Sequence, residues 1–230
     1  MKTRLPEPED MDDPTLDPDA HRLALAGLAR LNRISFSAEA VWQVLERAYR
    51  TAGSDRWVIV DLATGGGDLP IRLARKAQQK GYDWHWIGTD ISPVALDHAA
   101  CKARDQAVTV EWLRLDATRD TLPVCDWMVS SLFLHHLDET TLISLLQRMA
   151  AAARCGILID DLERTAFNRG LVWLGAHLLS RSVVVHQDSD RSVRAAFTLD
   201  EMTELARLAG LQPVQVKSRF PARFQLLWKH

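Results

Sequence analysis

A glycine-rich turn holds the residues best suited to binding a small molecule. Residues 58–68 read VIVDLATGGGD, so Asp61 precedes three consecutive glycines and Asp68 follows them. Glycine tolerates positive φ and lets a ligand approach the backbone with no Cβ in the way. The apolar run 57–60 before the turn is typical of a parallel strand buried on both faces. Because ligands of open α/β sheets bind beyond the carboxyl ends of the strands, the turn is predicted to be a binding loop.

A dinucleotide is the first ligand class to weigh for this loop. Counting a G-x-G-x-x-G/A pattern from Gly65 places Gly67 correctly but puts Pro70 at the sixth position. Asp68 lies at the expected start of the next helix, where its carboxylate would repel a pyrophosphate. The loop therefore favours a ligand without phosphate groups.

The loop resembles the D-x-G-x-G-x-G motif of the class I S-adenosylmethionine-dependent methyltransferases. Asp61, Gly65 and Gly67 match the motif. Ala63 replaces its first glycine, a departure that is tolerable if the φ angle of Ala63 is negative. The continuation Gly67-Asp68-Leu69 looks like the ubiquinone/menaquinone methyltransferase branch and its small-molecule relatives.

Further matches follow the later predicted strands. The resemblance implies that Asp90 binds both ribose hydroxyls of the cofactor, and an ionised carboxylate suits this because it only accepts hydrogen bonds. It also implies that Ile91 flanks the adenine and that Asp116 accepts the adenine amino group. The segment 130–137 is similar to the segment that lies under the methionine moiety in the family. The complete set implied for S-adenosylmethionine is Asp61, Ala63, Thr64, Gly65, Gly67, Asp68, Asp90, Ile91, Asp116, Ala117 and Ser131.

Histidines and paired acids offer candidates for catalysis and for metal binding. His135 and His136 are adjacent, so at most one is expected to face the site; His135 is a candidate general base, with simple packing as the alternative. Asp160 and Asp161 end the fifth predicted strand, where metal-dependent catechol-type methyltransferases place two ligands. Those enzymes need a third acidic ligand after the fourth strand, and this chain has serines there. No metal is therefore expected.

The stretch from about 162 to 197 is longer than a minimal α/β unit needs, and it is expected to bind the methyl acceptor. His186 is a second candidate base. Arg191 and Arg194 could orient a phenol or a carboxylate, with solvated surface charges as the alternative. Trp42 and Trp173 are predicted to flank the cleft and to stack on an aromatic acceptor.

Strand and helix patterns alternate from residue 57 onwards, which indicates βαβ units. We expect a Rossmann-like, seven-stranded, mostly parallel sheet with helices on both faces. Residues 1–14 are predicted to form a flexible acidic tail, and residues 15–53 a helical N-terminal lid. Residues 54–230 are predicted to form the methyltransferase domain, with the insert at about 162–197.

The composition of the chain limits the classes of binding partner and the cellular compartment that we expect. The chain has 230 residues and a formal net charge of −2, so no bulk basic field attracts nucleic acid. Its three scattered cysteines predict free thiols in a reducing compartment. No apolar run reaches the roughly 18 residues of a membrane span. We expect a cytoplasmic monomer or homodimer.

The predicted function is methyl transfer from S-adenosylmethionine to a small molecule, leaving S-adenosylhomocysteine. O-methylation of a phenolic or polyketide-like hydroxyl is the first expectation. C-methylation of a quinone precursor and a non-catalytic cofactor-binding scaffold are the alternatives. Nucleic-acid methylation is disfavoured because the chain has Ser-Ser-Leu-Phe where adenine methyltransferases carry an (N/D)PP(Y/F) segment.

Overall fold

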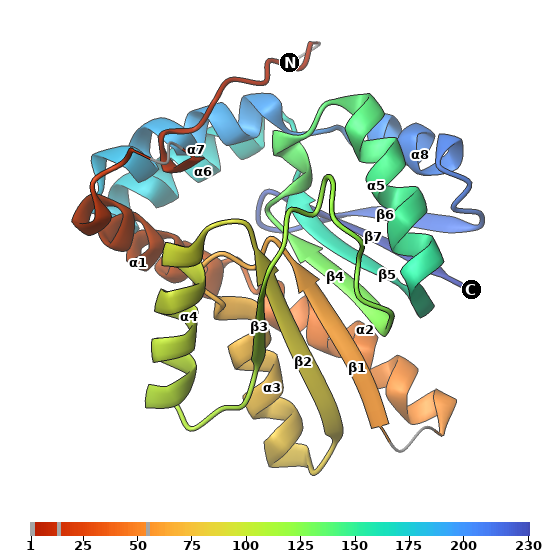
Figure 1. Cartoon of the computed structure of the whole chain (residues 1–230). Helices are drawn as coiled ribbons and strands as arrows, with labels where there is room; N and C mark the ends of the chain where they lie inside the picture. Colours follow the sequence, from red (N-terminus) through yellow and green to blue (C-terminus); the bar gives the residue numbers. More distant parts are fainter. Residues whose placement is uncertain (1–2, 13–14, 54–55) are drawn as a thin grey trace.

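A seven-stranded sheet forms the centre of the molecule (Figure 1). The computed structural model describes residues 3–12, 15–53 and 56–230. The strand order is β3-β2-β1-β4-β5-β7-β6, and β7 runs antiparallel to both of its neighbours. This confirms the predicted seven-stranded, mostly parallel sheet. The strands are β1 (Arg56–Leu62), β2 (Asp83–Asp90), β3 (Glu111–Arg114), β4 (Cys125–Ser131), β5 (Ala153–Leu162), β6 (Val214–Arg219) and β7 (Arg223–Lys229).

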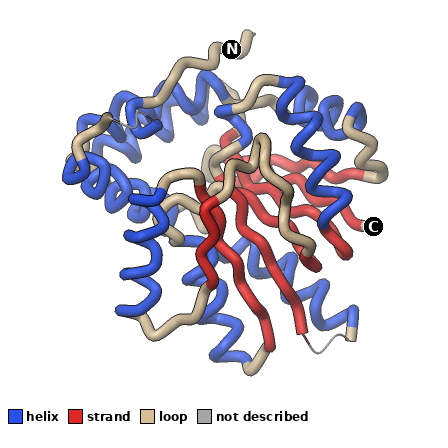
Figure 2. The backbone as a smooth tube through the Cα atoms, in the orientation of Figure 1, coloured by secondary structure: helices blue, strands red, loops and turns tan. Residues whose placement is uncertain are grey.

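Helices cover both faces of this sheet (Figure 2). The helices α2 (Ser37–Ala52) and α3 (Asp68–Lys80) pack on one face. The helices α5 (Glu139–Ala152) and α8 (Leu199–Leu208) pack on the other. The remaining helical elements are η1 (Asp10–Asp12), α1 (Pro18–Ile34), α4 (Pro93–Asp105), η2 (Leu134–His136), α6 (Ala166–Leu179) and α7 (Val183–Ala195).

The strand β1 shows why the sheet is covered on both sides. Trp57 and Ile59 are buried toward α2 and α3, while Val60 and Leu62 are buried toward α5. Alternate residues of a strand point to opposite faces, so a fully apolar strand needs a helical layer on each face.

Trp42 belongs to the core beneath α2 and does not flank a cleft. Its side chain is 2% exposed, and its ring centroid lies 5.0 Å from that of Trp84. Val41 and Leu45 are buried on the same helix beside it. The prediction that Trp42 stacks on the acceptor is therefore wrong, because the apolar stripe of α2 faces the sheet.

The predicted N-terminal lid divides into two parts. α2 packs under the sheet as a core helix. α1 instead contacts α6 and α7, and these three helices gather beyond the carboxyl ends of the parallel strands (Figure 1). In the described part of the chain, no helix has the length and apolar character needed to cross a membrane.

The polar run 186–194, which holds His186, Arg191 and Arg194, lies within the helix α7. α7 begins after Ser182, whose hydroxyl accepts a hydrogen bond from the backbone N–H of Val185, and its apolar side chains Val185 and Val193 are buried. The segment 3–12, expected to be a flexible tail, lies against α7 and η2. Its backbone bonds α7 directly, because the N–H of Leu5 donates to the carbonyl of Arg194 at 3.0 Å.

Candidate active site

A cavity of about 750 Å³ lies between the carboxyl ends of the strands and the layer formed by α1, α6 and α7. This is the position in which open α/β sheets bind ligands. One end of the cavity is lined by the β1–α3 loop and the end of β2. The other end is lined mainly by apolar side chains of α1 and α6. α7 adds Val185 and the polar side chains of Asp188, Ser189 and Ser192, which lie on the same lining as Glu9 and His135.

The β1–α3 loop is a backbone cradle with room for a ligand. Gly65 and Gly67 have φ angles of +53° and +70°. A Cβ on Gly67 would lie 2.6 Å from the ring of Trp112 and 2.8 Å from Ala99, so packing requires a glycine there. A Cβ on Gly65 would meet nothing within 4 Å. Gly65 thus faces open space at the cavity, as a residue that a ligand approaches closely would.

Ala63, which replaces the first glycine of the motif, does not have the negative φ angle that would make this replacement tolerable. Its φ angle is +53°, in the left-handed region that disfavours a side chain. Phe36, Leu132 and Ala222 also have positive φ angles, and all four residues line the cavity. Left-handed non-glycine residues tend to cluster at functional sites, where the surrounding structure holds them in place.

Asp90 joins the two loops at this end of the cavity. One carboxylate oxygen accepts a hydrogen bond from the backbone N–H of Gly65 at 2.8 Å, and the other accepts one from Ser92 at 2.9 Å. A carboxylate only accepts hydrogen bonds, which is the chemistry that hydroxyl donors require. Ile91 follows, 59% exposed, and lines the cavity. This geometry agrees with the expected binding of ribose hydroxyls at Asp90.

Asp61 lies at the bottom of the cradle with one oxygen unsatisfied. Its Oδ2 accepts a hydrogen bond from the Thr64 hydroxyl at 2.6 Å, while its buried Oδ1 has no partner among the described residues. Burial raises the pKa of Asp61 to about 7, the Thr64 hydrogen bond opposes this rise, and the charge of Asp90 adds to it. An orphaned carboxylate oxygen in a buried site suits a cationic donor such as an ammonium group.

The other expected cofactor residues divide into two groups. Asp68 and Ser131 line the cavity, and Asp68 forms an ion pair with Lys102. Asp116 and Ala117 are absent from the described lining. The carboxylate of Asp116 bonds the backbone and hydroxyl of Thr118, and Ala117 is buried in the core on the α5 side of the sheet. The structure therefore does not bring Asp116 and Ala117 into the cavity.

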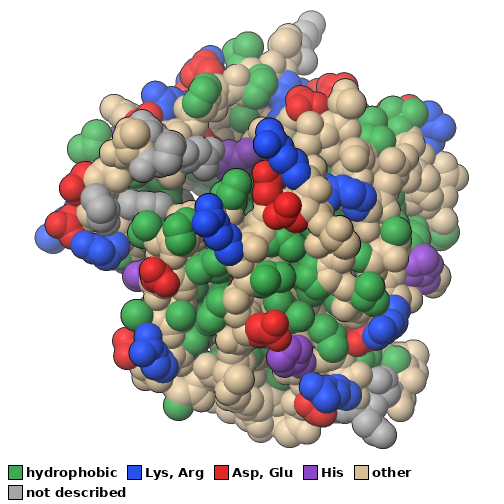
Figure 3. All heavy atoms as spheres, in the orientation of Figure 1, with side chains coloured by type: hydrophobic (Ala, Val, Ile, Leu, Met, Phe, Trp, Pro, Cys, Tyr) green, Lys and Arg blue, Asp and Glu red, His purple; other side chains and the backbone are tan. Residues whose placement is uncertain are grey.

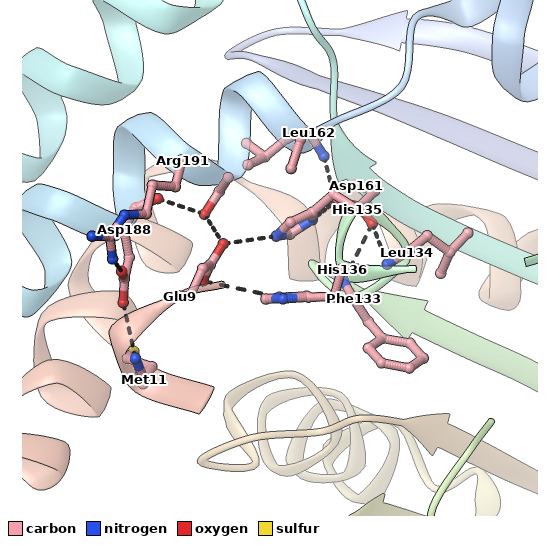
Figure 4. Close-up of polar contacts among 12 residues, drawn as sticks. Glu9, Met11, Phe133, Leu134, His135, His136, Asp161, Leu162, Asp188 and Arg191 are labelled. Carbon is pink, nitrogen blue, oxygen red and sulfur yellow. Dashed lines mark hydrogen bonds and ion pairs between the residues drawn. The ribbon is translucent and has the colours of Figure 1, made fainter. Parts of the chain in front are cut away.

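His135 is held by a buried carboxylate at the other end of the cavity (Figure 4). Its Nδ1 lies 2.7 Å from Oδ1 of Asp161. Asp161 also accepts hydrogen bonds from three backbone N–H groups, those of Phe133, Leu134 and Leu162. Alternate side chains of β5 point in opposite directions, so Asp161 faces η2, whereas Asp160 pairs with Arg219 on the other side of the sheet.

The electrostatics of His135 argue against its predicted role as a general base. Burial alone would lower the pKa of His135, but the charge and hydrogen bond of Asp161, together with Glu9, raise it to about 10. The imidazole therefore carries a proton at neutral pH and cannot accept another. It can instead hold an anionic oxygen.

Glu9 completes this polar group, and no feature of the sequence marks it. Its Oε1 lies 3.6 Å from Nε2 of His135, its Oε2 lies 4.0 Å from Nε2 of His136, and the Ser192 hydroxyl donates a hydrogen bond to it. Figure 4 shows Glu9 pointing toward both histidines. In the sequence, Glu9 is one acid of a proline-rich acidic run and has no periodic or motif context.

The predicted acceptor residues of the insert lie outside the cavity. His186, Trp173, Arg191 and Arg194 line a separate, more open hollow of about 560 Å³. The cavity-lining residues of α7 recur at helical spacing, and His186 falls between them on another face of the helix. These residues are Val185, Asp188, Ser189 and Ser192.

Three of the predicted residues in that hollow also have partners within the protein. The Nε2 of His186 lies 2.9 Å from the carbonyl of Ser180, Arg191 pairs with Asp10 at 2.6 Å, and Arg194 pairs with Glu7 at 2.9 Å. The structure therefore brings His186, Trp173 and the two arginines together in a hollow apart from the cavity, and their roles at the acceptor stay predictions.

Figure 3 shows how the charged side chains of the described residues are distributed on one face of the molecule. Lysine and arginine side chains are scattered there among acidic ones rather than gathered into a stripe.

Comparison with known proteins gives a domain family and a fold. Residues 59–156 match the family model described as a methyltransferase domain. Comparison with curated protein sequences gave no match.

Solved structures resemble the chain over most of its length. The plantazolicin methyltransferase BpumL, in complex with a triazolic desmethylPZN analog and SAH, has a TM-score of 0.68 at 14% identity; the alignment covers 93% of this chain and 92% of that one. A candidate O-methyltransferase from Nostoc punctiforme PCC 73102 has a TM-score of 0.63 at 17% identity, covering 90% of this chain and 60% of that one.

A third similar structure is an O-methyltransferase family 2 protein from Planctomyces limnophilus DSM 3776, in complex with apigenin. Its TM-score is 0.57 at 19% identity, and the alignment covers 85% of this chain and 61% of that one. This chain thus spans about three fifths of the length of both O-methyltransferase structures. Residues 59–156 match a methyltransferase domain, and the chain around them has the Rossmann-like fold of S-adenosylmethionine-dependent methyltransferases.

Proposed function

We propose that this chain transfers a methyl group from S-adenosylmethionine to an oxygen of a small, largely apolar molecule. One observation carries the proposal: the open cradle at Gly65 lies between an unsatisfied carboxylate oxygen of Asp61 and the carboxylate of Asp90, at the mouth of an apolar cavity. The cofactor is cationic and bears an ammonium group and two ribose hydroxyls, so its donors correspond to these acceptors.

The protein's part in the reaction is binding, alignment and exclusion of water. When bound, S-adenosylmethionine supplies a methyl group on a sulfonium centre. As the new O–C bond forms, the C–S bond breaks and the electron pair stays on sulfur, which leaves as a neutral thioether. Asp61 and Asp90 hold the cofactor, and the apolar walls orient the acceptor and exclude water.

The walls of the acceptor end indicate an apolar acceptor with an acidic oxygen. They are mostly hydrophobic, whereas His135, protonated at neutral pH, cannot serve as the base. An oxygen that is already ionised, as in an acidic phenol or a carboxylic acid, needs no base. The structure with the phenolic molecule apigenin supports an aromatic acceptor by likeness of fold. The apolar walls are lined by Leu25, Leu31, Leu171, Val172, Leu174, Leu178, Leu179 and Val185.

Calorimetric titration with S-adenosylmethionine, S-adenosylhomocysteine and NAD tests the cofactor. We expect the first two to bind and NAD not to bind. Because an ammonium group beside Asp61 would lower its raised pKa, binding at pH 7 should release a fraction of a proton. The apparent enthalpy should then depend on the ionisation enthalpy of the buffer, and Asp61→Asn should remove that dependence.

Each outcome of this titration has a distinct meaning. Absence of binding by both sulfur compounds would refute the proposal. Binding without transfer of a labelled methyl group to any phenol or carboxylic acid would favour a scaffold. A product methylated on carbon would replace O-methylation with C-methylation of a quinone precursor.

A further inference from the structure

The polar end of the cavity is occupied by a group from the N-terminal segment. Glu9 is 11% exposed, and its carboxylate lies among the side chains of His135, His136 and Ser192, with the carboxylate of Asp188 near enough to interact with it electrostatically. A carboxylate in an apolar cavity is costly unless charged and polar groups surround it. These three side chains therefore form a binding place for an anionic oxygen, and in this structure the chain fills it itself.

The segment that carries Glu9 is held by polar contacts rather than by a core of its own. Between residues 3 and 11 every residue keeps some exposure, and Leu5 is 46% exposed. The N–H groups of Asp10 and Met11 donate to the carboxylate of Asp188 at 2.9 and 3.1 Å. Met11 makes the main apolar contact, against α1, α6 and α7. Segments with few buried apolar contacts open at low free-energy cost.

Arg4 anchors the start of the same segment on η2. Its guanidinium donates hydrogen bonds to the carbonyls of His135 and Leu137 at 2.7 and 2.6 Å and lies over the ring of Phe197. In Figure 1 the segment runs along α7, to which the backbone of Asp10 and Met11 is hydrogen-bonded. The residues that hold it, Asp188 on α7 and the turn at His135, also line the cavity.

We propose that Glu9 occupies the subsite for an anionic oxygen of the acceptor, formed by His135, His136 and Ser192, and that an acceptor displaces the segment 3–12 when it binds. The segment is then an internal competitor that opens only for molecules carrying an acidic oxygen. This inference rests on the proposed function for the identity of the ligand as the methyl acceptor. The ligand class is an aromatic carboxylate or an acidic phenol.

A metal ion is the alternative occupant of the same group. Glu9, His135 and His136 offer three ligand atoms within 4.8 Å of one another. We favour the anionic oxygen because His135 already lies between two carboxylates and is held as a cation by them. A metal ion would have to displace that proton.

Binding of 1-naphthoate and of its neutral counterpart 1-naphthamide tests the proposal, with EDTA present and with and without S-adenosylhomocysteine. Glu9→Gln should tighten 1-naphthoate binding about tenfold if the segment is closed nine tenths of the time, because closure reduces the apparent affinity by the open fraction. Arg4→Ala removes a positive charge, but it also releases the segment 3–12 from η2. We therefore expect it to tighten 1-naphthoate binding as well. A purely electrostatic effect would weaken it instead.

Controls separate displacement from a general change in charge. Glu7→Gln removes a carboxylate of the same segment that pairs with Arg194 on the surface, and we expect less than a twofold change. Naphthamide binding should not respond to any of the three substitutions. In the unsubstituted protein, 1-naphthoate should accelerate hydrogen exchange at the amides of Asp10 and Met11, which bond to Asp188.

Three results would overturn the proposal. They are unchanged or weaker 1-naphthoate binding in both Glu9→Gln and Arg4→Ala, no binding of 1-naphthoate by any variant, and binding that appears only when Zn²⁺ replaces EDTA. The last would assign the group to a metal. The S-adenosylhomocysteine titration on the same preparations keeps the two proposals apart, because its failure would refute the methyltransferase while leaving the naphthoate result intact.

Discussion

The two ends of the cavity are assembled in different ways. The cofactor end comes chiefly from two adjacent strands and the loops that follow them, residues 61–69 and 90–91. The acceptor end comes from five segments spread along the chain, which lie within 9–36, 132–136, 162–179, 185–192 and 220–223. A short motif can therefore encode the first end, whereas the second exists only once the chain has folded.

The electrostatics of the two ends differ as well. At the cofactor end, Asp61 keeps an oxygen without a partner among the described residues, and Asp90 accepts hydrogen bonds from the backbone N–H groups of Gly65 and Ser92. At the acceptor end, His135 is compensated from both sides by Asp161 and Glu9. Removing Asp90 should thus mainly affect ligand affinity, whereas removing His135 should mainly affect protein stability.

The largest expected effect is on stability at the acceptor end. His135→Ala leaves Asp161 buried without its cation, and breaking a buried pair in this way costs about 3–5 kcal/mol of unfolding free energy. Urea denaturation at pH 7 measures it. The matched control is His136→Ala, whose side chain is a quarter exposed and which should cost below about 1 kcal/mol. Equal losses of unfolding free energy for the two variants would contradict the assignment of His135 as the cation that compensates Asp161.

The pH dependence of the stability loss in His135→Ala tests the same pairing of His135 with Asp161. The folded-state pKa of His135 is about 10, above its ordinary value of 6.5. The contribution of protonated His135 to the unfolding free energy is therefore fully present below pH 6.5 and is lost as the pH rises through about 10. The difference in unfolding free energy between the unsubstituted protein and His135→Ala should shrink between pH 7 and pH 10. A constant difference would show that the imidazole is neutral in the folded protein.

At the cofactor end the expected effect is on affinity. Asp90→Ala should weaken S-adenosylhomocysteine binding by roughly 1.5–3 kcal/mol, the value of hydrogen bonds to a charged group. Asp83→Ala, at the opposite end of β2 and exposed, is the control and should leave the affinity unchanged. Calorimetry checks both variants, and equal affinities would remove Asp90 from the ribose site.

A smaller effect is expected from backbone strain in the cradle. Ala63→Gly relieves a left-handed alanine and should raise the unfolding free energy by up to about 1 kcal/mol. Ala107 has the same backbone conformation but lies outside the cavity, so Ala107→Gly should give a similar gain. Only Ala63→Gly should also alter cofactor affinity. Destabilisation by Ala63→Gly would mean that the strain is absent.

The smallest effect is expected at the outer hollow. His186→Ala removes a ring that bonds the carbonyl of Ser180 and stacks on His177, away from the cavity. We expect changes in stability and in cofactor affinity within about 0.5 kcal/mol. A large loss of methyl transfer at unchanged stability would restore His186 as a catalytic residue.

The sequence by itself determined the sheet and the cofactor loop, because both depend on short-range patterns. The apolar run before Asp61 is itself a strand, the glycines follow it, and the acid at position 90 ends the next strand. Parallel strands bring their carboxyl ends to one edge. The placement of Asp90 beside Gly65 follows from this register alone. The sequence did not determine the sign of φ at Ala63, which its neighbours in the folded loop impose.

Only the tertiary structure decided which polar residues reach the acceptor end. Polar side chains lie all around α7, so its sequence alone did not tell whether His186 or Asp188 faces the cavity; long-range packing of α1 and α6 against α7 set that rotation. Glu9 and His135 are separated by 126 residues and meet because the segment 3–12 folds back along α7. The proton on His135 depends on that meeting and on burial beside Asp161, neither of which local sequence specifies.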